Sequence, residues 1–316
     1  MSATIAPPIE QRETFACFGS SCTVIVADAG EAGAGAASAV TAVRRRLEAW
    51  HEQFSRFLPD SELTRLNLNL AETVPVSPLM RRVVEAGVQA ARVTGGLVDP
   101  TLLTQIERAG YRSHHDGRGV PLRAALAMAP ARRPGRPAPA ANWRLVRTDR
   151  RTSSVTRPVG VRIDPGGIAK GVFADELAAL LAGHDAFVVD CGGDLRLGGR
   201  YAPAREVHVA SPFEDAVLHT FALRSGGVAT SGIGKRSWID ADGHVSHHLL
   251  DPASGRPAFT GVVQATALAP TATEAEMLSK AALLAGPAHA GEVLVHGGAF
   301  VLDDGDHVVL DPGAGS

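Results

Sequence analysis

Cysteine and aromatic residues are scarce in this sequence, and the cysteine spacing does not favour disulfides. Its 316 residues include three cysteines, ten phenylalanines, three tryptophans and two tyrosines. Cys17 and Cys22 lie an odd number of residues apart in a predicted strand, so their side chains should point to opposite faces. Cys191 is remote from both, and a disulfide framework is therefore not expected. The pattern predicts a reduced, cytoplasmic protein with a mainly aliphatic core.

Long hydrophobic runs, an export signal and an excess of one charge are also missing. No stretch approaches the roughly 18 uninterrupted apolar residues that cross a bilayer, so no transmembrane segment is expected. Residues 1–11 contain Pro7, Pro8 and Glu10 where a secretory signal would have an apolar run. Lysine and arginine total 31 against 33 aspartate and glutamate, a formal charge of −2. This balance argues against nucleic acid as a partner.

Hydrophobic periodicity predicts several helices separated by many short strands. Apolar residues recur at three- and four-residue steps from Val40 to Phe54, and Ser77 followed by Pro78 is typical of a helix start. Because helices and strands do not alternate regularly, the pattern favours an α+β fold on a mainly antiparallel sheet. Further helices are predicted at about 168–181 and 273–284 and after Asp99-Pro100, and strands at about 14–27, 187–189, 206–209, 217–223, 237–239, 262–268 and 300–310.

The chain is expected to fold as one domain over residues 14–316, after a flexible N-terminus at residues 1–13. Periodicity fails over about 111–142, where residues 131–140 read Ala-Arg-Arg-Pro-Gly-Arg-Pro-Ala-Pro-Ala. This composition predicts a solvated loop inside the domain.

The segment from Asp164 to Gly171 is the one that most suggests ligand binding. It reads Asp-Pro-Gly-Gly-Ile-Ala-Lys-Gly between a predicted strand and a predicted helix. Adjacent glycines let backbone N–H groups approach a phosphate, and Lys170 adds a cation, although the spacing is not that of a Walker A loop. A tight turn with Asp164 as a helix cap explains the same residues equally well. The glycine pairs at 95–96 and 192–193 are ambiguous in the same way.

Three histidines follow a glycine-rich bend that is expected at 226–232. His244, His247 and His248 have no nearby cysteine and no standard ligand spacing, so zinc binding is not favoured. His248 enters a turn in which it can act as a base toward a bound substrate. His247 is predicted to be a solvated surface residue.

These segments, in this order, resemble those of the ApbE family of FAD:protein FMN transferases. Each is weak alone, but the order is specific and runs from about residue 14 to 310. The resemblance implies an ApbE-like architecture related to the T-fold. The matching segments are Phe18 to Ser20, Phe54 to Phe57, Asp60 to Asn67, Thr94 to Thr101, Asp164 to Asp175, Val189 to Gly193, Ala229 to Gly232, His248 to Gly255 and Ala275 to Ala281.

The resemblance implies an enzyme that transfers FMN from FAD to a Ser or Thr hydroxyl of an acceptor flavoprotein and releases AMP. FAD as the substrate and Mg²⁺ are the expected ligands. His248 is implied as the base or as a flavin contact. The motif positions place FAD contacts at Phe18, Phe57, Leu97, Val98, Asp99, Asp164, Lys170 and His248, and a metal contact at the Gly167 carbonyl.

The sequence departs from the family pattern at several of these positions. Phe18 stands where members usually have Met, and Phe57 stands where they have Tyr, which keeps an aromatic surface but removes a hydroxyl. Glu276 and Lys280 stand where a helix usually supplies an Asp and a Thr to the metal. Glutamate remains an oxygen ligand, but a protonated lysine cannot coordinate magnesium. The ordinary explanation of this spacing is a surface ion pair.

Lys280 and a magnesium ion are not expected to share the usual site. Two unit charges about 4 Å apart interact by roughly 4 kcal/mol at an effective dielectric near 20, and a divalent ion about doubles this repulsion. We therefore hypothesise that the Lys280 ammonium, paired with Glu276, takes over part of the metal's catalytic role.

Two other functions stay open at this point. The chain could bind FAD without transferring FMN, or it could act as an FAD diphosphatase that uses water and yields FMN and AMP. The sequence identifies neither the acceptor protein nor the oligomeric state.

Overall fold

The computed structural model describes residues 9–29, 33–113 and 119–313, and an eight-stranded sheet forms its centre. Every neighbouring pair of strands in this sheet is antiparallel. The predicted α+β fold on a mainly antiparallel sheet is therefore confirmed. In spatial order the strands are β1 (Ile9–Cys17), β2 (Ser20–Asp28), β6 (Ala186–Asp190), β7 (Asp194–Gly198), β10 (Gly226–Gly232), β15 (Val262–Ala269), β16 (Gly298–Leu302) and β17 (His307–Leu310).

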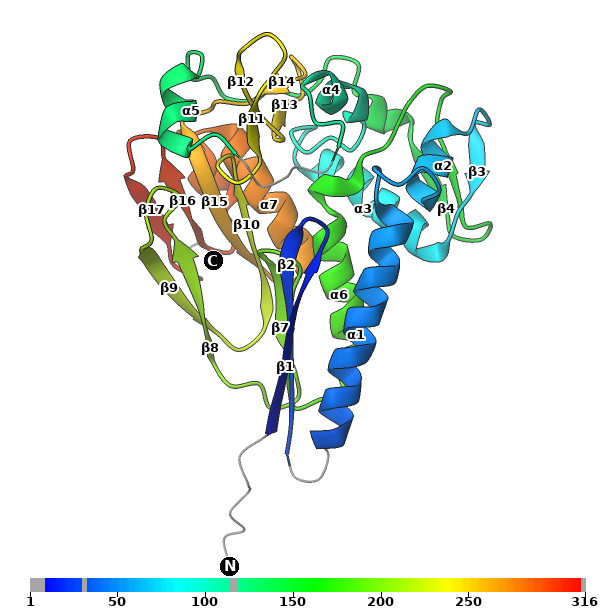
Figure 1. The fold of residues 1–316 in the computed structure, drawn as a ribbon, viewed down its shortest axis with the longest axis vertical. Coiled ribbons are helices and arrows are strands. Elements are labelled where there is room, and N and C mark those ends of the chain that lie inside the picture. Colours follow the sequence, from blue (N-terminus) through cyan, green and yellow to red (C-terminus); the bar gives the residue numbers. More distant parts are fainter. Residues whose placement is uncertain (1–8, 30–32, 114–118, 314–316) are drawn as a thin grey trace, which may run out of the picture.

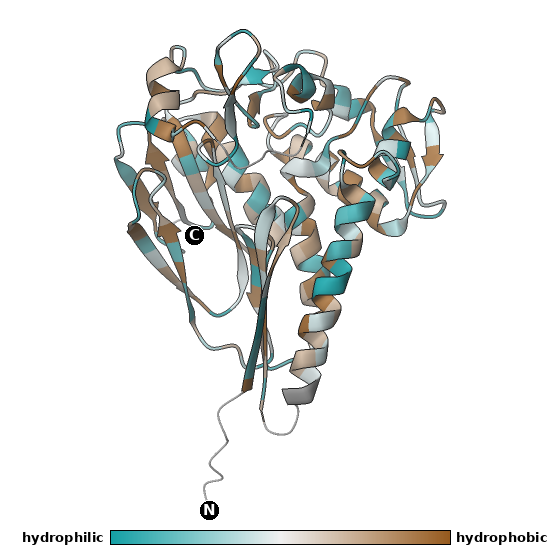
Figure 2. Cartoon of the chain, in the orientation of Figure 1, coloured by the Kyte–Doolittle hydropathy of each residue, from teal (hydrophilic) through white to brown (hydrophobic). Residues whose placement is uncertain are grey.

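Three helices cover one face of the sheet. They are α1 (Gly33–Phe54), α6 (Ala169–Leu181) and α7 (Ala272–Ala285), and Figure 1 shows them running beside the strands. Leu47 of α1 and Leu177 of α6 are fully buried in one core cluster with Val24 and Val189 of the sheet. Figure 2 shows hydrophobic and hydrophilic residues alternating in bands along α1, as expected for a helix with one buried face.

A hairpin covers the other face of the sheet. It consists of β8 (Arg205–Ala210) and β9 (Val217–Leu223), which pair antiparallel. Its Phe221 lies in a second cluster with Val188 and Leu197. Val188 and Val189 are consecutive in β6 and so point to opposite faces, which explains why this strand is buried on both sides.

The short elements gather at the end of the sheet opposite to the N-terminus, where Figure 1 shows α4, α5 and β11 to β14 together. Within the described ranges, every helix is too short or too polar to cross a membrane. The remaining elements of the described chain are α2 (Glu62–Leu68), β3 (Thr73–Pro75), α3 (Pro78–Val93), α4 (Leu103–Arg108), α5 (Leu122–Met128), η2 (Asn142–Leu145), β4 (Arg147–Asp149), β5 (Ser154–Thr156), η3 (Pro165–Gly167), β11 (Ser237–Ile239), β12 (Val245–His247), β13 (Leu250–Asp251), β14 (Arg256–Pro257) and α8 (Ala290–Val293).

Side-chain caps mark the helix starts that the sequence indicated. Ser77 accepts a hydrogen bond from the Met80 N–H at the start of α3, with Pro78 as the first helical residue. Thr271 caps α7 in the same way by accepting from the Glu274 N–H. Asp99 does not start a helix, because α4 begins at Leu103 and has no side-chain cap.

Two predictions about strands of the sheet were wrong. The first strand begins at Ile9, which pairs with Asp28 of β2, so residues 9–13 belong to the sheet; residues 1–8 lie outside the described ranges. The glycine-rich segment 226–232 is the strand β10 rather than a bend. This central strand packs directly against the start of α7. A Cβ at position 227 would lie 2.2 Å from the Thr271 carbonyl oxygen, so the close packing requires glycine there.

The segment 111–142 is more ordered than its composition predicted. It contains α5, whose Leu122 and Ala125 are buried in the core beneath α7. Further along, the Gly135 N–H donates a hydrogen bond to the Leu284 carbonyl at 2.7 Å. These contacts tie parts of the segment to the core and to the end of α7. Residues 131–140 themselves form no helix or strand and are mostly exposed, as predicted for a solvated loop; residues 114–118 lie outside the described ranges.

His247 is buried, so the predicted solvated position was wrong. It lies in β12 with 1% of its surface exposed, edge-on to the Phe259 ring at 4.8 Å between centroids. Desolvation by burial lowers the pKa of His247 from 6.5 to about 3, although a backbone hydrogen bond with Ala258 opposes the shift. This histidine is therefore neutral in the folded protein near pH 7.

Lowering the pH from about 6.5 to 5 is expected to destabilise the fold through His247. The unfolded state binds a proton near pH 6.5 that the folded state excludes until about pH 3, so stability is complete above pH 6.5 and falls below it. One histidine contributes at most about 1.4 kcal/mol per pH unit. Denaturant unfolding at stepped pH measures this slope, which should be shallower in His247→Gln. Equal slopes in both proteins would contradict the burial of a neutral His247.

Candidate functional site

A cavity of about 1550 Å³ opens at the end of the sheet where the short elements gather. It is larger than the roughly 300–1,000 Å³ typical of pockets for drug-sized ligands, so it has room for a dinucleotide. Its wall contains ten of the residues that the sequence nominated, while Glu276 is fully buried beneath Lys280. The ten are Phe18, Phe57, Leu97, Val98, Asp99, Asp164, Gly167, Lys170, His248 and Lys280.

The turn that begins at Asp164 has features of both interpretations of its sequence, a capped turn and a loop that faces a ligand. The Asp164 carboxylate accepts a hydrogen bond from the Gly166 N–H at 2.9 Å, so it does cap the short η3 turn. The Asp164 N–H donates to the Pro100 carbonyl at 2.8 Å, which ties this turn to the Asp99 loop. Gly166 and Gly167 nevertheless line the cavity, although the Gly166 N–H is already bonded to Asp164.

Asp99 presents one unused carboxylate oxygen. Its Oδ1 accepts hydrogen bonds from the Thr101 N–H at 2.8 Å and from the Thr101 hydroxyl at 2.6 Å. Its Oδ2 is buried and has no hydrogen-bond partner among the described residues. Desolvation raises the pKa of Asp99, although the two bonds from Thr101 oppose the shift. A ligand that offers an N–H or O–H donor would satisfy this oxygen.

Two lysine–carboxylate pairs form the floor of the cavity. Lys170 of α6 contacts Asp194 of β7 through its Nζ and Oδ2 atoms, and Lys280 Nζ lies 2.9 Å from Glu276 Oε1 within α7. Glu276 Oε2 accepts a hydrogen bond from the Gly171 N–H at 2.7 Å. Glu276 is 0% exposed and Lys280 9%, so the alternative of a surface ion pair is wrong.

The pKa values of these groups depend on their mutual charges. Burial raises the pKa of Asp194, and the neighbouring Glu276 carboxylate adds to this, against the opposing effect of Lys170 and Lys280. For Glu276 the balance is reversed: burial favours the neutral acid, but Lys280, Lys170 and the Gly171 N–H hold its pKa below the ordinary value. Glu276 is therefore a carboxylate held by positive groups.

His248 lies partly buried in the cavity wall. Desolvation and the nearby Arg236, His247 and Lys280 hold the pKa of His248 well below 6.5. Its Nδ1 atom is buried and has no hydrogen-bond partner among the described residues. The imidazole is thus neutral near pH 7, and its Nδ1 atom is a buried acceptor without a partner in the described part of the chain.

Aromatic rings and an arginine line one side of the cavity. The Arg56 guanidinium lies over the rings of Phe57 and Tyr111, 4.3 and 4.6 Å from their centroids, and donates to the Tyr111 carbonyl at 2.8 Å. Tyr111 in turn stacks on Trp238 at 5.4 Å. Phe18, in the turn between β1 and β2, stacks on Phe173 at 5.2 Å. A planar ring system would find suitable partners on this side.

Sequence reasoning assigned no role to four residues that shape the site. Asp194 directly follows the Val189 to Gly193 motif, and this carboxylate after a glycine pair is visible in the sequence but was not nominated as a site residue. Arg56 lies inside a recognised motif, but it was not singled out. Arg236, which donates to the Phe18 carbonyl at 3.3 Å, and Tyr111 carried no pattern that would have distinguished them.

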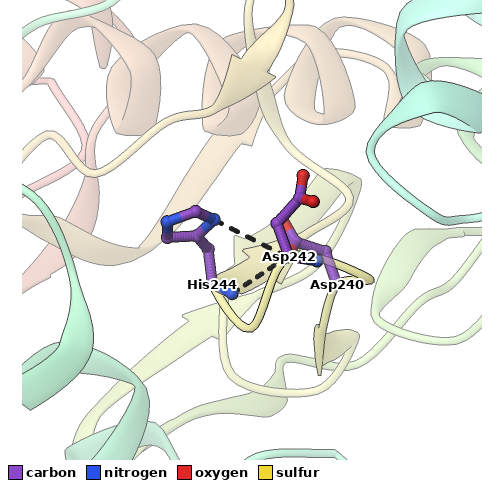
Figure 3. Close-up of side chains that lie close together, drawn as sticks. All are labelled: Asp240, Asp242 and His244. Atoms are coloured by element: carbon purple, nitrogen blue, oxygen red, sulfur yellow. Dashed lines mark hydrogen bonds and ion pairs between the residues drawn. The ribbon is translucent and has the colours of Figure 1, made fainter.

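A group of potential metal ligands lies outside the cavity. Asp240, Asp242 and His244 gather on the exposed turn between β11 and β12, as Figure 3 shows. The Asp240 carboxylate already accepts the backbone N–H groups of Asp242 and His244, at 3.0 and 2.9 Å. These bonds explain the cluster as a turn stabilised by its first residue.

Comparisons with known proteins find relatives in sequence and in structure. The FAD:protein FMN transferase of Treponema pallidum is 33% identical over 141 residues, which is 40% of this chain and 39% of that protein. The FAD:protein FMN transferase of Salmonella typhimurium is 27% identical, over 82% of this chain and 74% of that protein. The crystal structure of the ApbE protein of Thermotoga maritima aligns with a TM-score of 0.76 and 26% identity, over 96% of this chain and 97% of that chain.

The model of the ApbE family matches residues 18–301, which is most of the chain. The match covers the segments whose order suggested this family, from Phe18 to the strand β16. The prediction from the sequence is confirmed, and this chain belongs to the ApbE family.

Proposed function

We propose that this protein transfers the FMN part of FAD to a Ser or Thr hydroxyl of an acceptor flavoprotein. The acceptor oxygen bonds to the phosphorus on the riboflavin side, the bond from that phosphorus to the bridging oxygen breaks, and AMP leaves with that oxygen. The hydroxyl proton passes to a base. The observation that carries the proposal is the convergence of Lys170, Lys280 and the Gly167 turn on one cavity wall.

The diphosphate of FAD is proposed to lie between the Gly167 turn and the two lysines. Phosphoryl transfer needs groups that hold the phosphates and positive charge that stabilises the transition state. Backbone N–H groups of the turn and the ammonium groups of Lys170 and Lys280 have the required chemistry. The geometry supports this placement because all three groups come from different elements and face the same space.

The two ring systems of FAD are proposed to occupy the sides of the cavity. Leu97 and Val98 offer an apolar surface for the adenine or the flavin ring, and Asp99 Oδ2 can accept from an amino or hydroxyl group. Phe18 and Phe57 are the aromatic residues assigned to cofactor binding. Phe57 has no hydroxyl, and its ring contacts the Arg56 guanidinium and the Tyr111 ring on this side of the cavity.

His248 is proposed to accept the proton of the acceptor hydroxyl. A base must be neutral when the hydroxyl attacks, and the low pKa of His248 meets this requirement at pH 7. Its unpartnered Nδ1 atom supports the assignment.

The family resemblance also implies a magnesium ion near the Gly167 carbonyl and positions 276 and 280, and the residues present do not fit it. Lys280 has no lone pair for a metal while it is protonated, and its ammonium lies 2.9 Å from Glu276 Oε1. The other Glu276 oxygen accepts the Gly171 N–H. No step of the proposed reaction is therefore assigned to a metal at this position.

We also propose a cytoplasmic location, which the thiols support. Cys17, Cys22 and Cys191 are all free and buried, as expected for a protein of a reducing compartment.

Incubation with FAD and a candidate acceptor is expected to give a covalent flavin–acceptor product and AMP. Intact mass of the acceptor and chromatography of the nucleotides measure both products. Free FMN with AMP would instead identify a diphosphatase, and unchanged FAD bound to the protein would identify a binding protein. The control is the same acceptor with its target hydroxyl removed, which should stay unlabelled.

His248→Gln is expected to lower kcat/KM for transfer by about 10²- to 10⁴-fold, the usual contribution of a general base. Because the pKa of His248 lies well below 6.5, wild-type kcat/KM should stay level as the pH falls from about 8 to 6. His247→Gln is the matched control, since His247 is the adjacent histidine and does not line the cavity; its activity should be retained. A wild-type profile that declines around pH 6.5, or equal losses in the two variants, would contradict the assignment.

A further inference from the structure

In both lysine–carboxylate pairs on the cavity floor, the lysine faces the cavity and the carboxylate lies behind it. The lysine side chains are partly exposed, 16% for Lys170 and 11% for Lys280, and both line the cavity. The carboxylates of Asp194 and Glu276 are 1% and 0% exposed and lie behind the lysines. The four charges balance as a group, but the surface that a ligand meets is positive.

Glu276 cannot turn toward the cavity to bind a metal ion. It lies where α6 passes α7 so closely that a Cβ on Gly171 would be 2.6 Å from the Ala272 carbonyl oxygen. This contact brings the Gly171 N–H to Glu276 Oε2, while Oε1 binds the Lys280 ammonium. Turning the side chain away would leave a buried N–H and a partly buried ammonium without their partner, which is costly.

Lys280 is held at the place where the floor meets the Gly167 turn. A Cβ built on Gly167 would lie 3.6 Å from both Cδ and Cε of Lys280, so the lysine stem packs against the glycine. Glu276 fixes the ammonium at the end of this stem. A lysine ammonium has three N–H donors, and Glu276 accepts one of them, so the others are available to phosphate oxygens.

We propose that the ammonium of Lys280 replaces a divalent cation in this protein, so that FAD binding and FMN transfer require no metal ion. The inference rests on the proposed function. In the transfer step, Lys280 stabilises the negative charge that develops on the phosphoryl oxygens, and Lys170 holds the adjacent phosphate. The proton, the leaving AMP and the new phosphoester bond are as described above.

Two measurements on the purified full-length protein test the inference. Flavin fluorescence titration gives the affinity for FAD, and intact mass of the acceptor gives the rate of transfer. Each is made with excess EDTA and again with excess MgCl₂. For the wild type, both quantities should agree within about twofold between the two conditions, since the cation is part of the chain.

Two substitutions at one position separate the role of charge from that of metal binding. Lys280→Thr removes the ammonium and supplies an oxygen ligand beside Glu276, so transfer in EDTA should fall by about 100-fold and recover at least tenfold with MgCl₂. Lys280→Met keeps the length of the side chain without charge or oxygen, and its loss should not be recovered by MgCl₂. Thermal unfolding of each variant shows whether it is folded.

The outcomes distinguish this inference from the proposed function. Wild-type transfer or FAD affinity that rises tenfold or more with MgCl₂ over EDTA would overturn metal independence, while leaving FMN transfer intact. FAD binding that is equal in both conditions, without any transfer, would support the inference for binding and overturn the transferase function. A failure to bind FAD in either condition would overturn both.

Discussion

A buried carboxylate, Glu276, is the constraint on which the site depends. An isolated carboxylate in a protein interior is strongly disfavoured, so its oxygens must be satisfied by nearby positive groups. The Gly171 N–H and the Lys280 ammonium provide these partners, and the first is possible because Gly171 has no side chain where α6 meets α7. The packing of two helices thereby determines where the Lys280 ammonium lies.

The same principle orders the rest of the floor. Asp194 is as deeply buried as Glu276, and its Oδ2 atom is paired with Lys170 of the first turn of α6. In both pairs the anion is on the protein side and the cation faces the cavity. In the proposed reaction, the doubly charged diphosphate meets preorganised positive charge, which needs little rearrangement when more negative charge develops.

The sequence predicted much of the fold because its local signals agree with the tertiary structure. The helices α1, α3, α6 and α7 and the hairpin β8–β9 follow from apolar periodicity and caps such as Ser77. Several of the failures share a physical cause, which is contact with partners distant in the sequence. His247 is covered by Phe259, the Gly135 N–H is bonded to the end of α7, and the glycines of β10 suit a strand because α7 begins beside Gly227.

Ten of the residues nominated from the sequence line one cavity. They could be nominated because glycine turns with neighbouring charged residues form motifs that are visible along the sequence. The irregular succession of predicted helices and strands indicated the α+β class, while the order of these motifs identified the family and the presence of Lys280 where members usually have Thr. It could not show whether Glu276 and Lys280 form a solvated pair or a buried one, since spacing along a helix is the same in both cases. Only the tertiary structure decided this, because the dielectric environment and the hydrogen-bond partners of a charge are set by whichever elements fold against it.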